Sequence, residues 1–409
     1  MRRRLISLKK AGPILVVLVF ILGATVTSEN RAGAQETASG QRTAPQVAAP
    51  DPPTPNAEAW TLTDADSGLY LTGENPDEQL PIGSTTKVMT ALETLEEGID
   101  PDEEVTVPTE AEAYVGDVYS NVGLIAGERL TVRDLLEAAL IPSGTDAVYT
   151  LAQDLGGGSV DNFVEKMNAR ASSMGLENTH FETPAGLDTS GNYSSARDLA
   201  TITQAALKYP LFDEIVRTRD TTISTQNRDI TIHNTNQLLS TYPKATGVKT
   251  GTTPQSGANL VASAQDGDES YIAVVLGDGE DPERFEDARA ILDYGFNNYE
   301  RQTLVSQDEV YGEEPLPYRR GEFVELVAEK DVAGPVNSRS QVDRQVTTEE
   351  LPSEAEAGQE LGEVEVFVDG ESAGTSPLVA QEGYGEASLW DKGWYYTLGW
   401  LWEKASQLV

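Results

Sequence analysis

Hydrophobic and polar positions predict a group of helices in the middle of the first three hundred residues. Apolar residues within 84–97 recur at helical spacing, and Gly98 is a suitable stop. Similar patterns predict helices at 130–140, 146–155 and 160–174.

Strand-like runs lie on either side of these helices. The runs 59–62 and 69–71 flank a glycine-containing turn and predict a β-hairpin. After the helices come three apolar runs and a closing amphipathic helix, at 247–253, 259–264, 271–276 and 284–299. This order predicts an α/β or α+β domain over residues 58–300, whose sheet carries strands from both ends of the domain.

The remainder of the chain has a different pattern. Residues 301–387 contain strand-forming runs and an Asp369-Gly370 turn, which predict a small β-rich domain. In residues 388–409 the tryptophans Trp390 and Trp394 share one helix face with other apolar side chains, and charged residues lie largely opposite. The uncharged stretch is too short to span a bilayer, so we expect an amphipathic helix in the membrane surface. The alternative is a helix packed on the β-rich domain.

The N-terminal region predicts export. Five basic residues within the first ten precede an apolar run at 11–26, and Ala32-Gly33-Ala34 provides a small-residue cleavage site. Residues 1–34 therefore read as a secretory signal or an uncleaved anchor, and both place the protein at the extracytoplasmic face of the cell membrane or in the wall. Residues 35–57, rich in Ala, Pro and Thr, predict a disordered linker.

The amino-acid composition limits the kinds of catalytic and metal site that the chain can form. The 409 residues include no cysteine and two histidines, so cysteine nucleophiles, disulfides and Cys-ligated metals are excluded. With 29 basic and 67 acidic residues the net charge is −38. Nucleic acid is not an expected partner, because phosphate binding needs a basic surface. High solubility is the simplest interpretation of the charge, and adaptation to a salt-rich habitat is the alternative.

A serine and a lysine one helical turn apart form the first candidate site. In Ser84-Thr85-Thr86-Lys87 the two side chains share a helix face at a helix start. The lysine amine can serve as the base for the Ser84 hydroxyl if burial or a nearby cation such as Lys249 lowers its pKa. For an isolated motif of this kind, a serine helix cap with an unrelated lysine is the alternative.

Two later motifs supply the other candidate residues. Lys249-Thr250-Gly251 lies on a predicted strand, where Lys249 and Thr250 could bind a substrate carboxylate. The backbone N–H groups of Thr252 and Ser84 could form an oxyanion hole. In Ser143-Gly144-Thr145 the Ser143 hydroxyl could relay protons, and the alternatives are a helix cap here and a surface turn for the strand motif.

These motifs and their surroundings resemble the low-molecular-mass penicillin-binding proteins, the D-alanyl-D-alanine carboxypeptidases of serine peptidase family S11. The similar blocks extend over most of residues 57–299: 81–92, 127–136, 179–187, 193–198, 247–251 and 292–296. The resemblance implies a serine β-lactamase/penicillin-binding-protein-like catalytic domain, followed by the β-rich domain and the amphipathic helix. It also implies removal of the terminal D-alanine from peptidoglycan stem pentapeptides through an acyl-serine intermediate, acylation by β-lactams, and no metal or cofactor.

One residue departs from the family pattern. The second motif usually ends in asparagine, whereas this chain has Thr145, whose shorter hydroxyl offers one donor. This change supports an alternative function, a catalytically weak relative that binds stem peptides or β-lactams as a sensor. A β-lactamase would need a deacylating glutamate, and Glu165 with Asn168 is only loosely similar in spacing. His180 and His233 are expected to be structural.

Overall fold

The computed structural model describes residues 50–279 and 282–396. The predicted signal at 1–34, most of the linker at 35–57 and the end of the C-terminal helix lie outside the described residues. The chain separates into two compact units, Ala49–Arg301 and the part that begins at Gln302.

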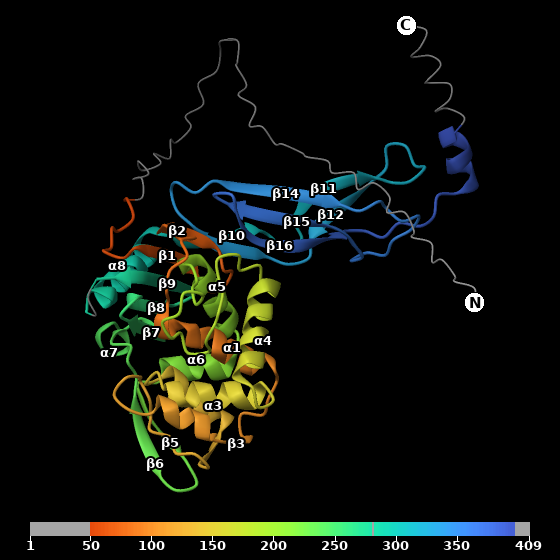
Figure 1. Ribbon diagram of the computed structural model, residues 1–409. Coiled ribbons are helices and arrows are strands. Elements are labelled where there is room, and N and C mark those ends of the chain that lie inside the picture. The colour runs from red at the N-terminus through yellow and green to blue at the C-terminus, as the bar shows by residue number, and fades with distance from the viewer. Residues whose placement is uncertain (1–49, 280–281, 397–409) are drawn as a thin grey trace, which may run out of the picture. The chain divides into compact units, whose positions relative to one another are not determined.

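An antiparallel five-stranded sheet organises the first unit, in the order β2-β1-β9-β8-β7 (Figure 1). Its strands are β1 (Ala59–Asp64), β2 (Tyr70–Glu74), β7 (Ala245–Thr253), β8 (Gly257–Asp266) and β9 (Glu269–Asp278). β1 pairs with both β2 and β9. The predicted hairpin and the predicted meeting of strands from both ends of the domain are therefore confirmed.

Helices cover both faces of this sheet. Helix α8 (Glu283–Asn298) packs on one face and α5 (Ala196–Leu207) on the other. Along β8, Val261 joins the core on the α5 side, whereas Leu260 and Ala262 join the core on the α8 side. Alternate side chains of a strand point to opposite faces, so a sheet covered twice needs the nearly continuous apolar runs seen in the sequence.

A helical layer completes the first unit and carries two of the three motifs. Its helices are α1 (Lys87–Glu96), α2 (Val132–Leu140), α3 (Thr145–Leu155), α4 (Val160–Ser173) and α6 (Pro210–Arg217). Two small antiparallel pairs of strands lie beside this layer, β3–β4 (Glu104–Thr106, Arg129–Thr131) and the hairpin β5–β6 (Asp220–Ser224, Asp229–His233). The connection from β3 to β4 contains the 3₁₀ helix η2 (Thr109–Tyr114). The short helix α7 (Leu238–Thr241) lies on the other side of the sheet, where Leu238 joins the core with α8.

Two helix starts differ from the prediction. The helix predicted from residue 130 begins at Val132, because Thr131 and Asp134 form a capping box and the preceding residues pair as β4. The helix predicted from residue 84 begins at Lys87, after the 3₁₀ helix η1 (Gly83–Thr86). The Thr85 hydroxyl donates to the carbonyl of Ile82 at 2.7 Å, a local bond that competes with the α-helical pattern.

The second unit is built from strands, as its sequence predicts. A five-stranded sheet has the order β11-β12-β16-β15-β14, and β10 pairs with β13. The strands are β10 (Glu300–Val305), β11 (Val310–Pro315), β12 (Phe323–Ala328), β13 (Val332–Val336), β14 (Val342–Thr348), β15 (Glu360–Val368) and β16 (Glu371–Ala380). Asp369 and Gly370 connect β15 to β16 with φ of +54° and +89°, values that suit a tight hairpin turn.

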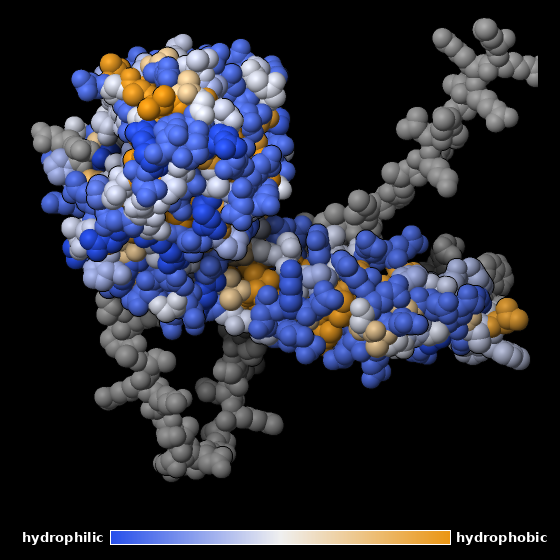
Figure 2. Space-filling model, turned by 90° about the horizontal axis from the view of Figure 1, so that it is seen from below, coloured by the Kyte–Doolittle hydropathy of each residue, from blue (hydrophilic) through white to orange (hydrophobic). Residues whose placement is uncertain are grey.

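The face of the molecule shown in Figure 2 is mostly hydrophilic, in keeping with the acidic composition. Residues 389–396 are helical. Leu389 and Trp390 are each 88 % exposed and Trp394 is 63 % exposed. Within residues 50–279 and 282–396, every helix is too short or too polar to cross a membrane.

Candidate active site

The first motif brings a hydroxyl and an amine together where η1 meets α1. Ser84 is partly accessible, whereas Lys87 is 1 % exposed. Lys87 Nζ lies 2.8 Å from Ser84 Oγ, a hydrogen-bond distance across which a neutral amine can take the hydroxyl proton. Ser84 is not a helix cap, because the residue in the cap position of α1 is Thr86 and it makes no side-chain capping bond.

The second motif adds two oxygens around the same amine. Ser143 Oγ lies 3.1 Å and Thr145 Oγ1 lies 3.4 Å from Lys87 Nζ, and both side chains are buried. Ser143 has φ of +69°, in the left-handed region, and Gly144 rather than Ser143 occupies the cap position of α3. The turn between α2 and α3 therefore directs the Ser143 hydroxyl at the lysine, and the helix-cap alternative for this serine is wrong.

The third motif lies on β7, against the 3₁₀ helix that carries Ser84. A Cβ on Gly251 would lie 2.7 Å from the Ile82 carbonyl oxygen and 3.1 Å from the Ser84 nitrogen, so only glycine allows this approach. Lys249 is 1 % exposed and donates to the Thr250 carbonyl at 2.9 Å. The motif is thus part of the central sheet, and the alternative of a surface turn is wrong.

Two backbone N–H groups lie close together at this contact. A Cβ added to Gly83 would lie 3.4 Å from the Thr252 nitrogen, and a Cβ added to Gly251 would lie 3.1 Å from the Ser84 nitrogen. This proximity is compatible with an oxyanion hole made by Ser84 and Thr252.

The sequence did not reveal two residues that contact the third motif. Arg284, 4 % exposed at the start of α8, donates from Nη1 to the Gly251 carbonyl at 3.0 Å and to Thr252 Oγ1 at 2.8 Å. Thr235 Oγ1 lies 2.6 Å from Thr250 Oγ1. In the sequence, Arg284 is recognisable only as a basic residue at the start of a predicted helix. The hydrophobic pattern does not predict that this helix lies against β7.

Burial controls the charge of both lysines. It lowers the pKa of Lys87 to about 7, and the negative charge of Asp146 opposes this effect. Burial also holds the pKa of Lys249 well below its usual range, and the charges of Lys87 and Arg284 lower it further. Burial, rather than the expected charge of Lys249, is thus the cause that makes a neutral Lys87 accessible near neutral pH.

The two histidines make their hydrogen bonds to residues outside the three motifs. His180 Nδ1 is 2.7 Å from the Gly191 carbonyl, and His233 Nδ1 is 2.5 Å from Asp220 Oδ1. Among the described residues no group of three or more acidic, histidine or cysteine side chains is arranged to hold a metal. Asn192 donates to Thr86 Oγ1 at 3.2 Å and so holds the side chain of a residue within the first motif.

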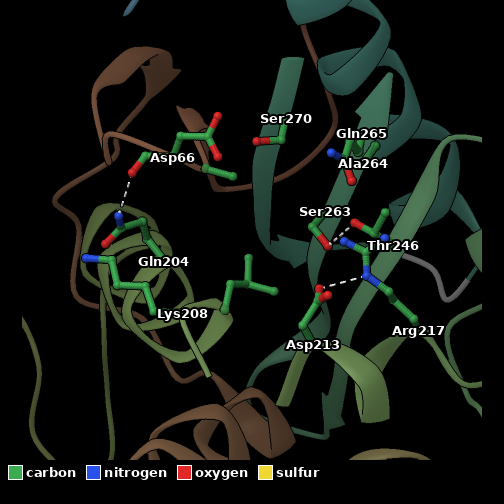
Figure 3. A pocket seen from close by; sticks show the side chains of 12 residues that line it. Asp66, Gln204, Lys208, Asp213, Arg217, Thr246, Ser263, Ala264, Gln265 and Ser270 are labelled. Atoms are coloured by element: carbon green, nitrogen blue, oxygen red, sulfur yellow. Dashed lines mark hydrogen bonds and ion pairs between the residues drawn. The ribbon is translucent and has the colours of Figure 1, made fainter. Parts of the chain in front are cut away.

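A cavity of about 290 Å³ lies elsewhere in the first unit (Figure 3). Part of its polar wall is paired within itself, since Arg217 binds Asp213 and the hydroxyls of Thr246 and Ser263 lie 2.7 Å apart. None of the predicted site residues lines it. The candidate site is therefore identified by the side chains of the three motifs and not by this cavity.

Known families match both parts of the chain. Residues 46–280 match the family described as D-alanyl-D-alanine carboxypeptidase, and residues 299–386 match the one described as penicillin-binding protein 5, C-terminal domain. The D-alanyl-D-alanine carboxypeptidase DacD of Escherichia coli is 34 % identical over 357 residues, which cover 84 % of this chain and 90 % of that protein. DacF of Bacillus subtilis, also a D-alanyl-D-alanine carboxypeptidase, is 32 % identical and covers 81 % of this chain and 87 % of its own.

Solved structures show the same similarity. Penicillin-binding protein 5 from Haemophilus influenzae has a TM-score of 0.69 and 31 % identity, and covers 82 % of this chain and 99 % of its own. The Streptomyces K15 DD-transpeptidase has a TM-score of 0.58 and 38 % identity, and covers 60 % of this chain and 99 % of its own.

Proposed function

We propose, since the chain belongs to the D-alanyl-D-alanine carboxypeptidase family, that Ser84 is the nucleophile with which it cleaves a D-Ala-D-Ala bond. The chain is a serine-type D-Ala-D-Ala carboxypeptidase, a hydrolase. The observation that carries the assignment of roles is the cluster around Lys87 Nζ, with Ser84 Oγ at 2.8 Å and Ser143 Oγ at 3.1 Å. The substrate we propose is the stem pentapeptide of peptidoglycan, and β-lactams would acylate the same serine.

The geometry supports a two-step reaction. Neutral Lys87 takes the Ser84 proton while Ser84 Oγ attacks the carbonyl carbon of the penultimate D-alanine. The resulting oxyanion accepts from the N–H groups of Ser84 and Thr252. When the C–N bond breaks, Ser143 passes a proton from Lys87 to the departing amine, and D-alanine leaves. Water, deprotonated by Lys87, then attacks the acyl-serine, which releases the shortened peptide and restores the Ser84 hydroxyl.

The third motif would hold the carboxylate of the D-alanine that leaves. Lys249 and Arg284 bring positive charge to this end of β7, and Thr250 offers a hydroxyl that Thr235 orients across 2.6 Å. Binding of an anion would favour the charged form of Lys249 and offset the effect of its burial. Thr145, whose hydroxyl lies beside Lys87, would contact the peptide in place of the family's asparagine.

The termini support a location outside the cytoplasm, at the membrane. Residues 1–34 have the pattern of an export signal or anchor. The exposed side chains of Leu389, Trp390 and Trp394 are apolar or amphipathic, as expected of a helix that lies in a bilayer surface. We therefore propose that residues 388–409 bind the extracytoplasmic surface of the cell membrane.

Release of D-alanine from a Lys-D-Ala-D-Ala peptide tests the function directly. The unchanged protein should release D-alanine and should be labelled by penicillin at Ser84, whereas Ser84→Ala should do neither. Ser67→Ala, which removes the hydroxyl of an exposed serine bonded to Asp64, is a control and should retain both activities. Labelling without any release of D-alanine would favour a binding or sensor protein, and rapid loss of the penicilloyl adduct would favour a β-lactamase.

A further inference from the structure

Asp146 is a buried carboxylate that directly follows the second motif in the sequence. It lies in the first turn of α3 and is fully buried. Its oxygens accept hydrogen bonds from the backbone N–H groups of Leu124 at 2.9 Å, Ala147 at 3.0 Å and Val122 at 3.2 Å.

These bonds tie a distant segment to the active-site turn. Val122 and Leu124 belong to residues 120–124, and in the same segment the Ser120 carbonyl accepts from the Thr145 N–H at 2.7 Å. The neighbouring Ser143 has a left-handed φ of +69°. A non-glycine residue keeps such a conformation only when its surroundings enforce it, so the attachment of this segment supports the direction of the Ser143 hydroxyl.

Asp146 also acts on the charge of Lys87. The charged groups around the lysine are Lys249 from β7, Asp146 from α3 and, behind Lys249, Arg284 from α8. Among the described residues, Asp146 is the acidic group whose charge acts on Lys87, and it raises the pKa of the amine against the effect of burial. Asp146 forms no ion pair among the described residues, although its charge also acts on the guanidinium of Arg228.

We propose that Asp146 is a positioning residue for acylation, which fixes the segment 120–124 against the Ser143 turn and places a buried negative charge near Lys87. The inference rests on the proposed function, because Asp146 acts through Lys87 and touches neither substrate nor the reacting atoms. Without its charge, Lys87 would lose its proton at lower pH and would also be a weaker base.

The chain provides a matched control in Glu128. This carboxylate is 2 % exposed and accepts from the Ile125 N–H at 3.0 Å, so it holds the next part of the same segment. Its charge is balanced by Arg228, whose Nε lies 2.9 Å from Glu128 Oε1. Loss of Glu128 should therefore loosen the segment while leaving Asp146, the acidic group whose charge acts on Lys87, in place.

The experiment compares Asp146→Asn with Glu128→Gln by the rate of acylation with a fluorescent penicillin as a function of pH. We expect the midpoint of the acid limb to move by about one pH unit to lower pH in Asp146→Asn. It should stay at the wild-type value in Glu128→Gln, although both variants should unfold at lower temperature than the unchanged protein. Asp146→Glu, which keeps the charge, should return the midpoint toward the wild-type value.

Two results would overturn the inference alone: an unchanged midpoint in Asp146→Asn, or equal shifts in Asp146→Asn and Glu128→Gln, which would indicate a purely structural role. If Asp146→Asn does not fold, Asp146→Ser, whose hydroxyl can still accept at the start of α3, should show the same acid shift. Failure of the unchanged protein to be labelled at Ser84 would instead overturn the proposed function, and the inference with it.

Discussion

At the scale of single residues, burial of one amine sets the pH range of the proposed reaction. Lys87 has a pKa of about 7, and only its neutral form can take the Ser84 proton. We expect the acylation rate to rise about tenfold per pH unit below this value and to level off above it. Single-turnover labelling with a fluorescent penicillin between about pH 5.5 and 8.5 measures this dependence. A rate that stays constant over the whole range would show that Lys87 is not the base.

Thr145 is the residue at which the site departs most from its family. Its hydroxyl accepts from Lys87 Nζ across 3.4 Å, at the outer limit of a hydrogen bond, and it offers one donor where an asparagine amide offers two. Thr145→Asn supplies a longer group with donor and acceptor. We expect kcat/KM for D-alanine release to rise about tenfold, which corresponds to about 1.4 kcal/mol.

Thr145→Val is the control for this prediction, because it keeps the shape of the side chain and removes the hydroxyl. It should lower kcat/KM, since Lys87 loses one of its three oxygen neighbours. If Thr145→Asn leaves the release of D-alanine at the wild-type rate, the departure from the family pattern has no catalytic consequence.

At the scale of elements, the site depends on the contact between β7 and the 3₁₀ helix η1. Gly251→Ala places a Cβ 2.7 Å from the Ile82 carbonyl oxygen, which is backbone and cannot move away as a flexible side chain would. The two elements must separate, at a cost of about 1–3 kcal/mol in the free energy of unfolding. Because the Ser84 and Thr252 N–H groups would move apart, kcat/KM should fall about a hundredfold.

Thermal unfolding and peptide hydrolysis together check this prediction. Gly385→Ala is a suitable control, because a Cβ there meets no atom within 4 Å. It should leave both the unfolding temperature and the activity unchanged. Wild-type activity in Gly251→Ala would mean that the close approach of β7 is not required for the reaction.

The elements also show how far the sequence predicts this molecule. Periodicity located the strands of the central sheet and the helices α3, α4 and α8 to within a few residues, because each has a buried face with a regular period. It did not predict the 3₁₀ helix that carries Ser84, since a local bond from the Thr85 hydroxyl decides that conformation. The motifs located Ser84, Lys87 and Lys249. Arg284 and Asp146 act through contacts between segments that are far apart in sequence, and a local sequence pattern does not predict such contacts.

At the scale of the whole molecule, the dominant property is the net charge of −38. Removal of residues 1–34 would make the mature chain still more negative, because that segment carries six basic residues and one acidic residue, and −38 − 5 = −43. A few carboxylates, such as Glu128, are buried and paired with an arginine, but most of the excess acidic side chains are exposed and repel one another. The compact state therefore carries a repulsive energy that the expanded, unfolded chain partly relieves.

Salt should stabilise the folded protein for this reason. The Debye length falls from about 10 Å at 0.1 M to about 3 Å at 1 M salt, so added NaCl screens repulsion between surface carboxylates. We expect the midpoint of thermal unfolding to rise by several degrees between about 0.05 M and 1 M NaCl at pH 7. The same titration near pH 4.2, the isoelectric point, is the control, because the net charge there is close to zero. A midpoint that falls with salt at pH 7, or that rises equally at both pH values, would mean that charge repulsion is not what limits the stability of the fold.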